Sequence, residues 1–368
     1  MKNLILKCFT AALVMMCLMF TTVYANPDFE DTGEKTNLEL IRSEMQSDEF
    51  AELLAVYVQD TEANGYTRKE MLDSYLGELY QIPELTKDNE IIYNDDIWHC
   101  PIICSGTVMA DIDFVIKNGK VFCSVSAAYT DEINEYIGKN RIMFFSEDQF
   151  ICMDAESSVF FARDDAENAI AVHNFSQTDC SEDKKVSTIL GIGEEAAVPM
   201  YDVGPCVLPN YPSRDQEDKW LCWAATIASM VAYKFPSEYS NITMYDVCNV
   251  VNCYEGATWD TVQAAMNHYF TSPYVPTAIN ASLTRQQIQT VINNNDPALM
   301  DSITDDGSSA HATALIGYQI TSGSMRVKMM NPATGKEQWT YYDPTDKVAY
   351  SMSNRVYTWF ATIRLMYR

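Results

Sequence analysis

The chain has 368 residues and a formal net charge of −26, with 51 acidic against 25 basic side chains. This acidic balance argues against a nucleic-acid-binding protein and against attachment to anionic membrane surfaces, because both attract basic proteins. The length is enough for two ordinary domains of roughly 100–200 residues each.

The first 25 residues have the pattern of an export signal. Lys2 and Lys7 flank the start, an apolar run follows from Ala11 to Phe20, and Val23-Tyr24-Ala25 precedes a cleavage site. This apolar run is shorter than the roughly 20 residues of a membrane-spanning helix. We therefore expect a secreted protein without a membrane anchor.

Residues 26–195 are predicted to form a separate α+β domain. Apolar positions with helical spacing indicate helices over residues 35–80. Two strand-like runs, Asp113–Lys117 and Val121–Val125, flank Asn118-Gly119, which is a strong signal for a β-hairpin. Further strands are predicted at Arg141–Phe145, Gln149–Met153 and Val159–Ala162. A polar, glycine-containing stretch over residues 180–205 predicts a linker.

Residues 196–368 are predicted to form a second domain with helices first and an antiparallel sheet last. One helix begins near Cys222, and two others are predicted at Trp259–Phe270 and Thr284–Asn293. The predicted strands are Ala298–Ile303, His311–Ile320, Arg326–Met330 and Gln338–Tyr342.

The cysteine count indicates an unpaired thiol. Of 11 cysteines, Cys8 and Cys17 lie in the signal, so nine remain in the exported chain, an odd number. If Cys222 is the free thiol, the other eight allow up to four disulfides: Cys100, Cys104, Cys123, Cys152, Cys180, Cys206, Cys248 and Cys253. His99 beside Cys100 and Cys104 raises the alternative of zinc, but no second ligand pair has matching spacing, so we expect no metal.

Cys222 has the surroundings of a nucleophile. It stands where a polar loop turns into an alanine-rich helix, and the N–H groups of a helix N-terminus favour a thiolate. Gln216, six residues earlier, supplies a neutral amide that can donate to an oxyanion.

His311 and Asn331 complete the arrangement. His311 begins an apolar strand, and Asn331 ends the next strand before Pro332. A hairpin between them would place the two side chains together, so that the asparagine holds the imidazole in the correct tautomer. His311 is then the general base for Cys222.

These motifs resemble those of papain-like cysteine peptidases. They are Gln216 with Cys222-Trp223-Ala224-Ala225, His311-Ala312-Thr313 and Asn331-Pro332, within residues 205–345. The resemblance is best with compact bacterial members: staphopain-like, avirulence-effector-like and bacteriocin-processing-peptidase-like domains. It implies a papain-like fold for residues 196–368, Cys222 as nucleophile, His311 as base, Asn331 as orienting residue and Gln216 as oxyanion donor. Papain relatives often carry tryptophan at the position of Ala333, which leaves Trp339 as a candidate to shield the histidine.

The resulting hypothesis is a secreted bacterial cysteine endopeptidase that acts on protein or peptide substrates without a cofactor. Residues 26–195 would be an inhibitory pro-region that binds the catalytic cleft in cis, which makes the chain a zymogen, or an accessory domain. The alternatives are an acyltransferase, a cell-wall amidase, or an inactive binding protein on a papain scaffold. The intact set of Gln216, Cys222, His311 and Asn331 argues against the last of these.

Overall fold

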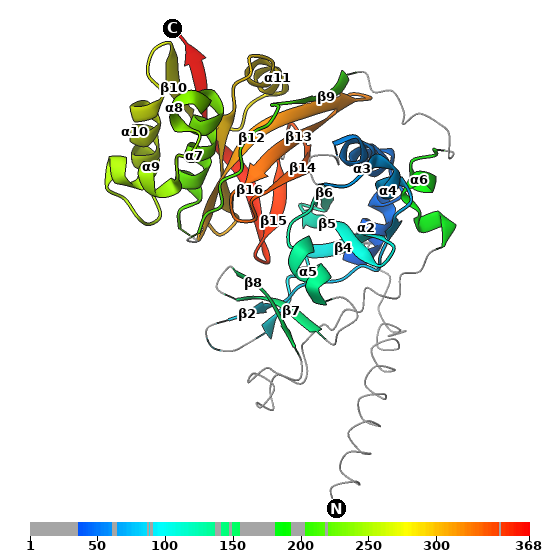
Figure 1. The fold of residues 1–368 in the computed structure, drawn as a ribbon. Helices are drawn as coiled ribbons and strands as arrows, with labels where there is room; N and C mark the ends of the chain where they lie inside the picture. Colours follow the sequence, from blue (N-terminus) through cyan, green and yellow to red (C-terminus); the bar gives the residue numbers. More distant parts are fainter. Residues whose placement is uncertain are drawn as a thin grey trace, which may run out of the picture. The chain divides into compact units, whose positions relative to one another are not determined.

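In the computed structural model, strands from both halves of the chain belong to one antiparallel sheet of 12 strands (Figure 1). Its order is β1-β4-β5-β6-β14-β13-β12-β11-β16-β10, with β9 paired to β12 and β15 paired to β16. The structure describes residues 36–60, 65–86, 88, 91–136, 141–146, 149–154, 181–192, 203–217, 220–345 and 347–368. The predicted export signal, the predicted strand Val159–Ala162 and Cys180 lie outside the described residues.

The N-terminal half begins with helices and continues into strands, as predicted. Its elements are α2 (Asn37–Glu44), α3 (Asp48–Asp60), α4 (Arg68–Leu72), β1 (Tyr75–Leu76), β4 (Ile97–Cys104), β5 (Thr107–Lys117), β6 (Lys120–Ser126) and α5 (Thr130–Tyr136). The β5–β6 hairpin is confirmed, because Asn118 and Gly119 both have positive φ, 53° and 72°. This is the backbone that a two-residue turn between twisted strands requires.

A second, smaller sheet and the predicted linker complete this half. The sheet has the order β3-β2-β7-β8, from β2 (Glu84–Leu85), β3 (Ile91–Ile92), β7 (Arg141–Ser146) and β8 (Gln149–Asp154). Where residues 180–205 are described, they form regular structure: a 3-10 turn (Glu182–Lys184), α6 (Val186–Ile189) and β9 (Val203–Val207). Val186 is fully buried, and its N–H donates to the carbonyl of Ser74. This stretch is therefore packed in part, which its polar composition did not indicate.

The C-terminal half has helices first and an antiparallel sheet last, which confirms the predicted α+β order. The helices are α7 (Cys222–Lys234), α8 (Pro236–Tyr239), α9 (Met244–Val251), α10 (Trp259–Tyr269) and α11 (Arg285–Asn293). The strands are β10 (Tyr274–Ile279), β11 (Ala298–Thr304), β12 (Ala310–Thr321), β13 (Ser324–Asn331), β14 (Lys336–Tyr342), β15 (Ala349–Met352) and β16 (Arg355–Tyr367). Helices α7 to α10 gather on one side of these strands (Figure 1). Alanine-rich α7 is buried from Cys222 to Ala232, because its small side chains allow close packing.

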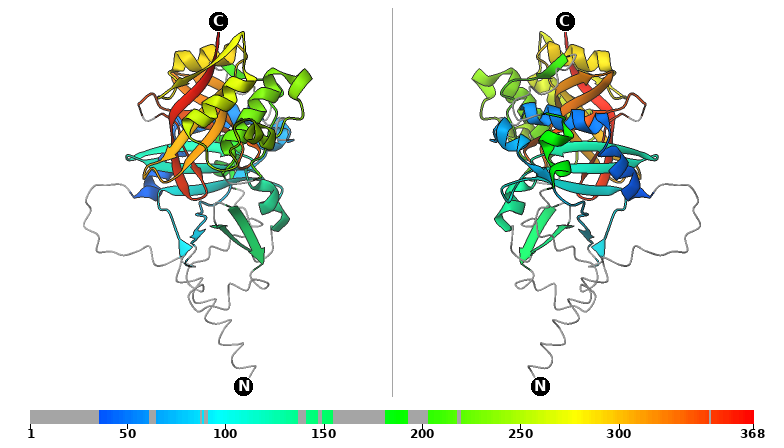
Figure 2. Two further views of the ribbon diagram at one scale, coloured as in Figure 1. Left: turned by 90° about the vertical axis from the view of Figure 1, so that its left-hand side faces the viewer. Right: turned by 90° about the vertical axis from the view of Figure 1, so that its right-hand side faces the viewer.

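The two halves meet in the middle of the large sheet, where β6 pairs with β14. In Figure 2 the cyan and teal strands of the first half lie beside the orange and red strands of the second. The register places Val125 opposite Trp339. One hydrophobic core then includes Phe50 and Phe114 from the first half and Trp339 and Tyr341 from the second. Residues 40–368 accordingly form one compact unit, and the structure does not confirm a separate N-terminal domain.

The described cysteines carry free thiols. They are Cys100, Cys104, Cys123, Cys206, Cys222, Cys248 and Cys253. The eight candidate cysteines therefore do not form four disulfides. Their even number, once Cys222 is set aside, was misleading. None of the described helices has both the length and the apolar character of a membrane span.

Candidate active site

Cys222 is the first residue of α7, at the place the sequence predicted, and it lies against strand β12. The backbone amide of Ala312 on β12 lies near the sulfur and lowers the pKa of the Cys222 thiol, although burial has the larger, opposite effect. One turn further along α7, the hydroxyl of Thr226 donates to the carbonyl of Ala312 over 3.1 Å. These contacts hold the start of the helix beside the residue that follows His311.

His311 and Asn331 lie on neighbouring strands, and their side chains meet. The distance from His311 Nε2 to Asn331 Oδ1 is 2.8 Å. Asn331 Oδ1 also accepts the backbone N–H of Ala333 over 3.0 Å. Because a backbone N–H can only donate, the atom in this position is the oxygen, and His311 Nε2 must carry a hydrogen. The neutral imidazole therefore has its free lone pair on Nδ1.

The loop that carries Gln216 runs along the turn after Asn331. The backbone N–H of Gln216 donates to the carbonyl of Pro332 over 2.8 Å. Ser213 Oγ donates to the carbonyl of Gly335 over 2.9 Å. Gly335 has φ of +62°, a backbone conformation that favours glycine, and it lies beside the side chain of Asp215. The structure thus brings Gln216, predicted as the oxyanion donor, next to the end of the His311–Asn331 hairpin.

Cys222 and His311 are both neutral near pH 7 in this arrangement. Burial raises the pKa of the Cys222 thiol to about 11, although hydrogen bonds from backbone amides lower it. Burial also lowers the pKa of His311 to about 4, and its bond to Asn331 offsets only part of this effect. The sequence predicted that the helix N-terminus favours a thiolate at Cys222. The cost of removing a charged thiolate from water is larger than this stabilisation, so the thiol stays protonated. The site therefore holds a protonated thiol and an imidazole that can accept a proton.

Asp301 is a site residue that the sequence interpretation missed. It lies on β11 opposite Ala312, the residue whose backbone amide lies near the Cys222 sulfur. Burial raises the pKa of Asp301 to about 7, and its negative charge raises the pKa of Cys222. An acidic residue inside an apolar strand beside the histidine strand was the available signal.

Replacing Asp301 by asparagine should make Cys222 easier to ionise. Above pH 7 the native Asp301 carboxylate is charged and disfavours ionisation of the Cys222 thiol. Removing this charge should lower the pKa of Cys222 by up to about one unit, so Asp301→Asn should speed alkylation of Cys222 by iodoacetamide about 3- to 10-fold at pH 8. Below pH 6 the native Asp301 is itself protonated, and the two rates should converge. Asp260→Asn, an exposed acid on α10, is the matched control. Equal rates at pH 8 for Asp301→Asn and the unchanged protein would contradict this role.

An aromatic ring lies beside His311, but it is not Trp339. The indole of Trp339 is buried in the core shared by the two halves, and its Nε1 donates to Asp60 Oδ2 over 2.8 Å. The interpretation of Trp339 as a shield is therefore wrong. Tyr357 from β16 stands at 6.0 Å from the His311 ring, edge to face. Its hydroxyl is 2.9 Å from Ser309 Oγ. The sequence interpretation did not predict β16 and so did not find this residue.

The comparison with known proteins gives a family match for the segment that carries this site. Residues 209–360 match a family described as papain-like cysteine protease AvrRpt2, and no curated protein matches the chain. The matched segment contains Cys222, His311, Asn331 and Gln216, and it also includes Asp301 and Tyr357. Over this segment the chain is therefore similar to papain-like cysteine peptidases of the avirulence-effector type, one of the branches that its motifs resemble.

Proposed function

We propose that the protein is an exported cysteine endopeptidase that cleaves protein substrates through a thioester on Cys222. The observation that carries this proposal is the 2.8 Å contact between His311 Nε2 and Asn331 Oδ1, which leaves Nδ1 as a base. The family match over residues 209–360 supports cysteine protease activity in general. Export rests on the pattern of the first 25 residues.

The reaction follows from the protonation states of the site. His311 Nδ1 takes the proton from the Cys222 thiol as the sulfur attacks the carbonyl carbon of the substrate. The oxyanion is stabilised by N–H groups at the start of α7 and by the side-chain amide of Gln216. His311 then gives the proton to the departing amine. Water, activated by the same imidazole, hydrolyses the thioester and restores the thiol.

We also propose that the chain is cut near residues 190–210 on activation, while the N-terminal half stays attached. The cut follows the prediction of a zymogen. Attachment is supported by the pairing of β6 with β14 and by the buried core that both halves share. These contacts lie along β14 and at Ala349 of β15, so they favour the accessory interpretation over a pro-region that only blocks the cleft.

Labelling with an epoxide inhibitor of papain-type enzymes tests the nucleophile. In the folded protein we expect modification at Cys222, located by peptide mapping, and its loss in Cys222→Ala. The matched control is Cys253→Ser, which removes a half-buried thiol from the same half of the chain and should label normally. Folded, activated protein in which Cys222 stays unmodified would exclude the proposed nucleophile. Labelling without cleavage of any peptide in a diverse library would instead favour acyl transfer or amidase chemistry.

A further inference from the structure

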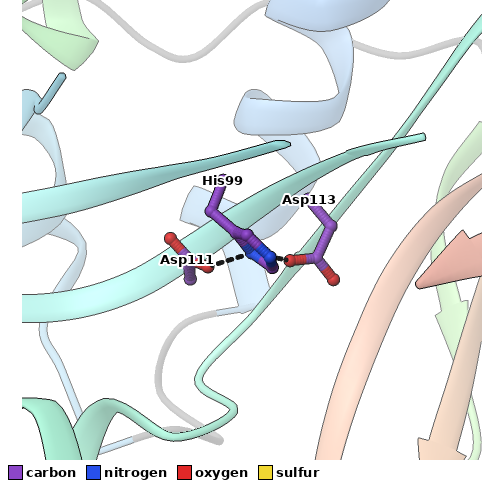
Figure 3. A group of neighbouring side chains, drawn as sticks. All are labelled: His99, Asp111 and Asp113. Carbon is purple, nitrogen blue, oxygen red and sulfur yellow. Dashed lines mark hydrogen bonds and ion pairs between the residues drawn. The ribbon is translucent and has the colours of Figure 1, made fainter. Parts of the chain in front are cut away.

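A histidine and two aspartates converge on adjacent strands β4 and β5, outside the catalytic residues. His99 Nδ1 lies 3.0 Å from Asp111 Oδ2 and 2.9 Å from Asp113 Oδ1. Figure 3 shows the imidazole ring between the two carboxylates. The three side chains offer ligand atoms that all lie within 4.8 Å of one another, and His99 and Asp111 are buried.

The partners of His99 differ from those that its sequence neighbours suggested. The cysteine pair Cys100 and Cys104 was the candidate from spacing along the chain. Successive side chains on a strand point to opposite faces, and the Cys100 thiol donates to the carbonyl of Gly77. Asp113 pairs with His99 across the β4–β5 ladder, and Asp111 lies two residues along the same face. The grouping therefore arises from strand register, which local spacing does not reveal.

The distances suit ligands of one metal ion. Two donor atoms at right angles, each about 2.1 Å from an ion, are about 3.0 Å apart, whereas tetrahedral donors are about 3.4 Å apart. The two separations, 3.0 and 2.9 Å, are compatible with neighbouring positions of an octahedron, and they are also the lengths of ordinary hydrogen bonds. The carboxylate and imidazole donors are those that Mn²⁺ and Zn²⁺ accept.

The charge of the cluster also favours a cation. Two carboxylates face one imidazole, so the cluster keeps a negative charge in a largely buried place even when the imidazole is protonated. A divalent ion with neutral imidazole would balance both carboxylates.

A small cavity beside the cluster supplies an independent indication of a ligand. Its volume is about 30 Å³, and His99, Asp111, Asp113, Asn331 and Gln338 contribute to its lining. Gln338 is 4% exposed, and its Nε2 is buried without a hydrogen-bond partner among the described residues. A space of this size holds one or two water molecules. An octahedral ion with three protein ligands needs such waters, and the Gln338 amide can donate to one of them.

We propose that His99, Asp111 and Asp113 bind one divalent transition-metal ion of the Mn²⁺ or Zn²⁺ class, with water from the adjoining cavity completing its coordination. The ion takes no part in peptide cleavage. Because the cavity is bordered by Asn331 as well as by β4 and β5, the ion would hold the N-terminal strands against the turn that carries the orienting asparagine. This inference does not depend on the proposed peptidase activity.

Metal titration of the full chain tests the site. The chain carries Cys222→Ala, so that the thiol does not compete for zinc, and is first stripped with a chelator. Calorimetric titration with Mn²⁺ and with Zn²⁺ should show one equivalent bound, and the thermal midpoint should rise with metal. Asp113→Asn keeps the shape of the side chain but removes its charge, and should weaken binding at least about tenfold. His268→Ala removes an exposed imidazole on α10 and should change nothing.

Two outcomes would overturn the proposal. One is the absence of uptake by the folded parent chain at millimolar metal, which would mean that the cluster is an ion pair only. The other is binding that survives Asp113→Asn or is lost in His268→Ala, which would mean binding elsewhere. If Asp113→Asn does not fold, X-ray absorption of the zinc-loaded parent chain decides the question. A nitrogen and oxygen coordination shell supports the site, and sulfur ligands exclude it.

Discussion

Replacing His311 by alanine is expected to lower kcat for cleavage of a protein substrate by about 10⁵–10⁶-fold, as for other nucleophile–base pairs. The buried Cys222 thiol has a raised pKa of about 11, so it ionises only when a base takes its proton. His311→Ala and Cys222→Ala should therefore be equally inactive, and the double variant should be no worse. Initial rates on a quenched fluorescent protein substrate, with circular dichroism to verify folding, measure the effect.

Asn331→Ala gives the contrast within the same series. The imidazole remains but loses the acceptor that fixes its tautomer, so we expect an intermediate loss of about 10²–10⁴-fold in kcat. The matched control, Cys253→Ser, should retain the parent rate. If folded His311→Ala kept more than a hundredth of the parent activity, the general base would have to be another group.

Local signals in the sequence were sufficient for many elements, including the helix that begins at Cys222. Asn118-Gly119 located a hairpin because only certain residues adopt positive φ at low cost. The predicted helix Thr284–Asn293 agrees with α11, whose first turn is capped by reciprocal hydrogen bonds between Thr284 and Gln287. The turn from polar loop to alanine-rich helix located Cys222 at the first residue of α7. In each case the determinant lies within a few residues of the element.

Features that depend on contacts between distant residues were not predictable in this way. The pairing of Val125 with Trp339 joins residues more than 200 positions apart, and nothing in either strand identifies its partner. The same pairing buries Trp339, which the sequence interpretation placed near His311. The pKa of Cys222 also depends on surrounding chain rather than on its own helix. Burial by that chain outweighs the helix N-terminus, the only contribution that the sequence displays.

Removing Asp60 is expected to reveal how firmly the two halves are joined. Asp60, at the end of α3, accepts from the Lys328 ammonium over 2.5 Å and from the Trp339 indole over 2.8 Å. The Lys328 side chain is 2% exposed. Asp60→Ala leaves this buried cation with Glu337 as its acidic partner. We therefore expect the free energy of unfolding to fall by about 3 kcal/mol, which is the lower end of the range for breaking a buried ion pair. Urea denaturation followed by tryptophan fluorescence measures the change.

Asp131→Ala is the matched control, because Asp131 also joins the two halves through a lysine. Its contact with Lys336 is 3.2 Å long, but the Asp131 side chain is 79% exposed. Exposed pairs contribute about 0–1 kcal/mol, so this variant should unfold close to the parent. If Asp60→Ala and Asp131→Ala lowered the free energy of unfolding equally, the contact between the two halves would not depend on buried charge.

Buried contacts between the two halves also decide whether the halves stay together when the chain is cut near residues 190–210. Arg326, 1% exposed, pairs with Glu52 over 2.5 Å, and Tyr341 donates to Glu44 over 2.8 Å. Departure of the N-terminal half would remove Glu52 from Arg326 and Asp60 from Lys328, which would keep Glu337, and it would expose Trp339 to water. We therefore expect the two fragments to elute together from a sizing column and to separate only in denaturant, with Asp60→Ala lowering the denaturant needed. Spontaneous release of the N-terminal fragment, with full activity of the remainder, would instead identify a removable pro-region. In that case the buried charges of β13 must be satisfied by rearrangement within the C-terminal half.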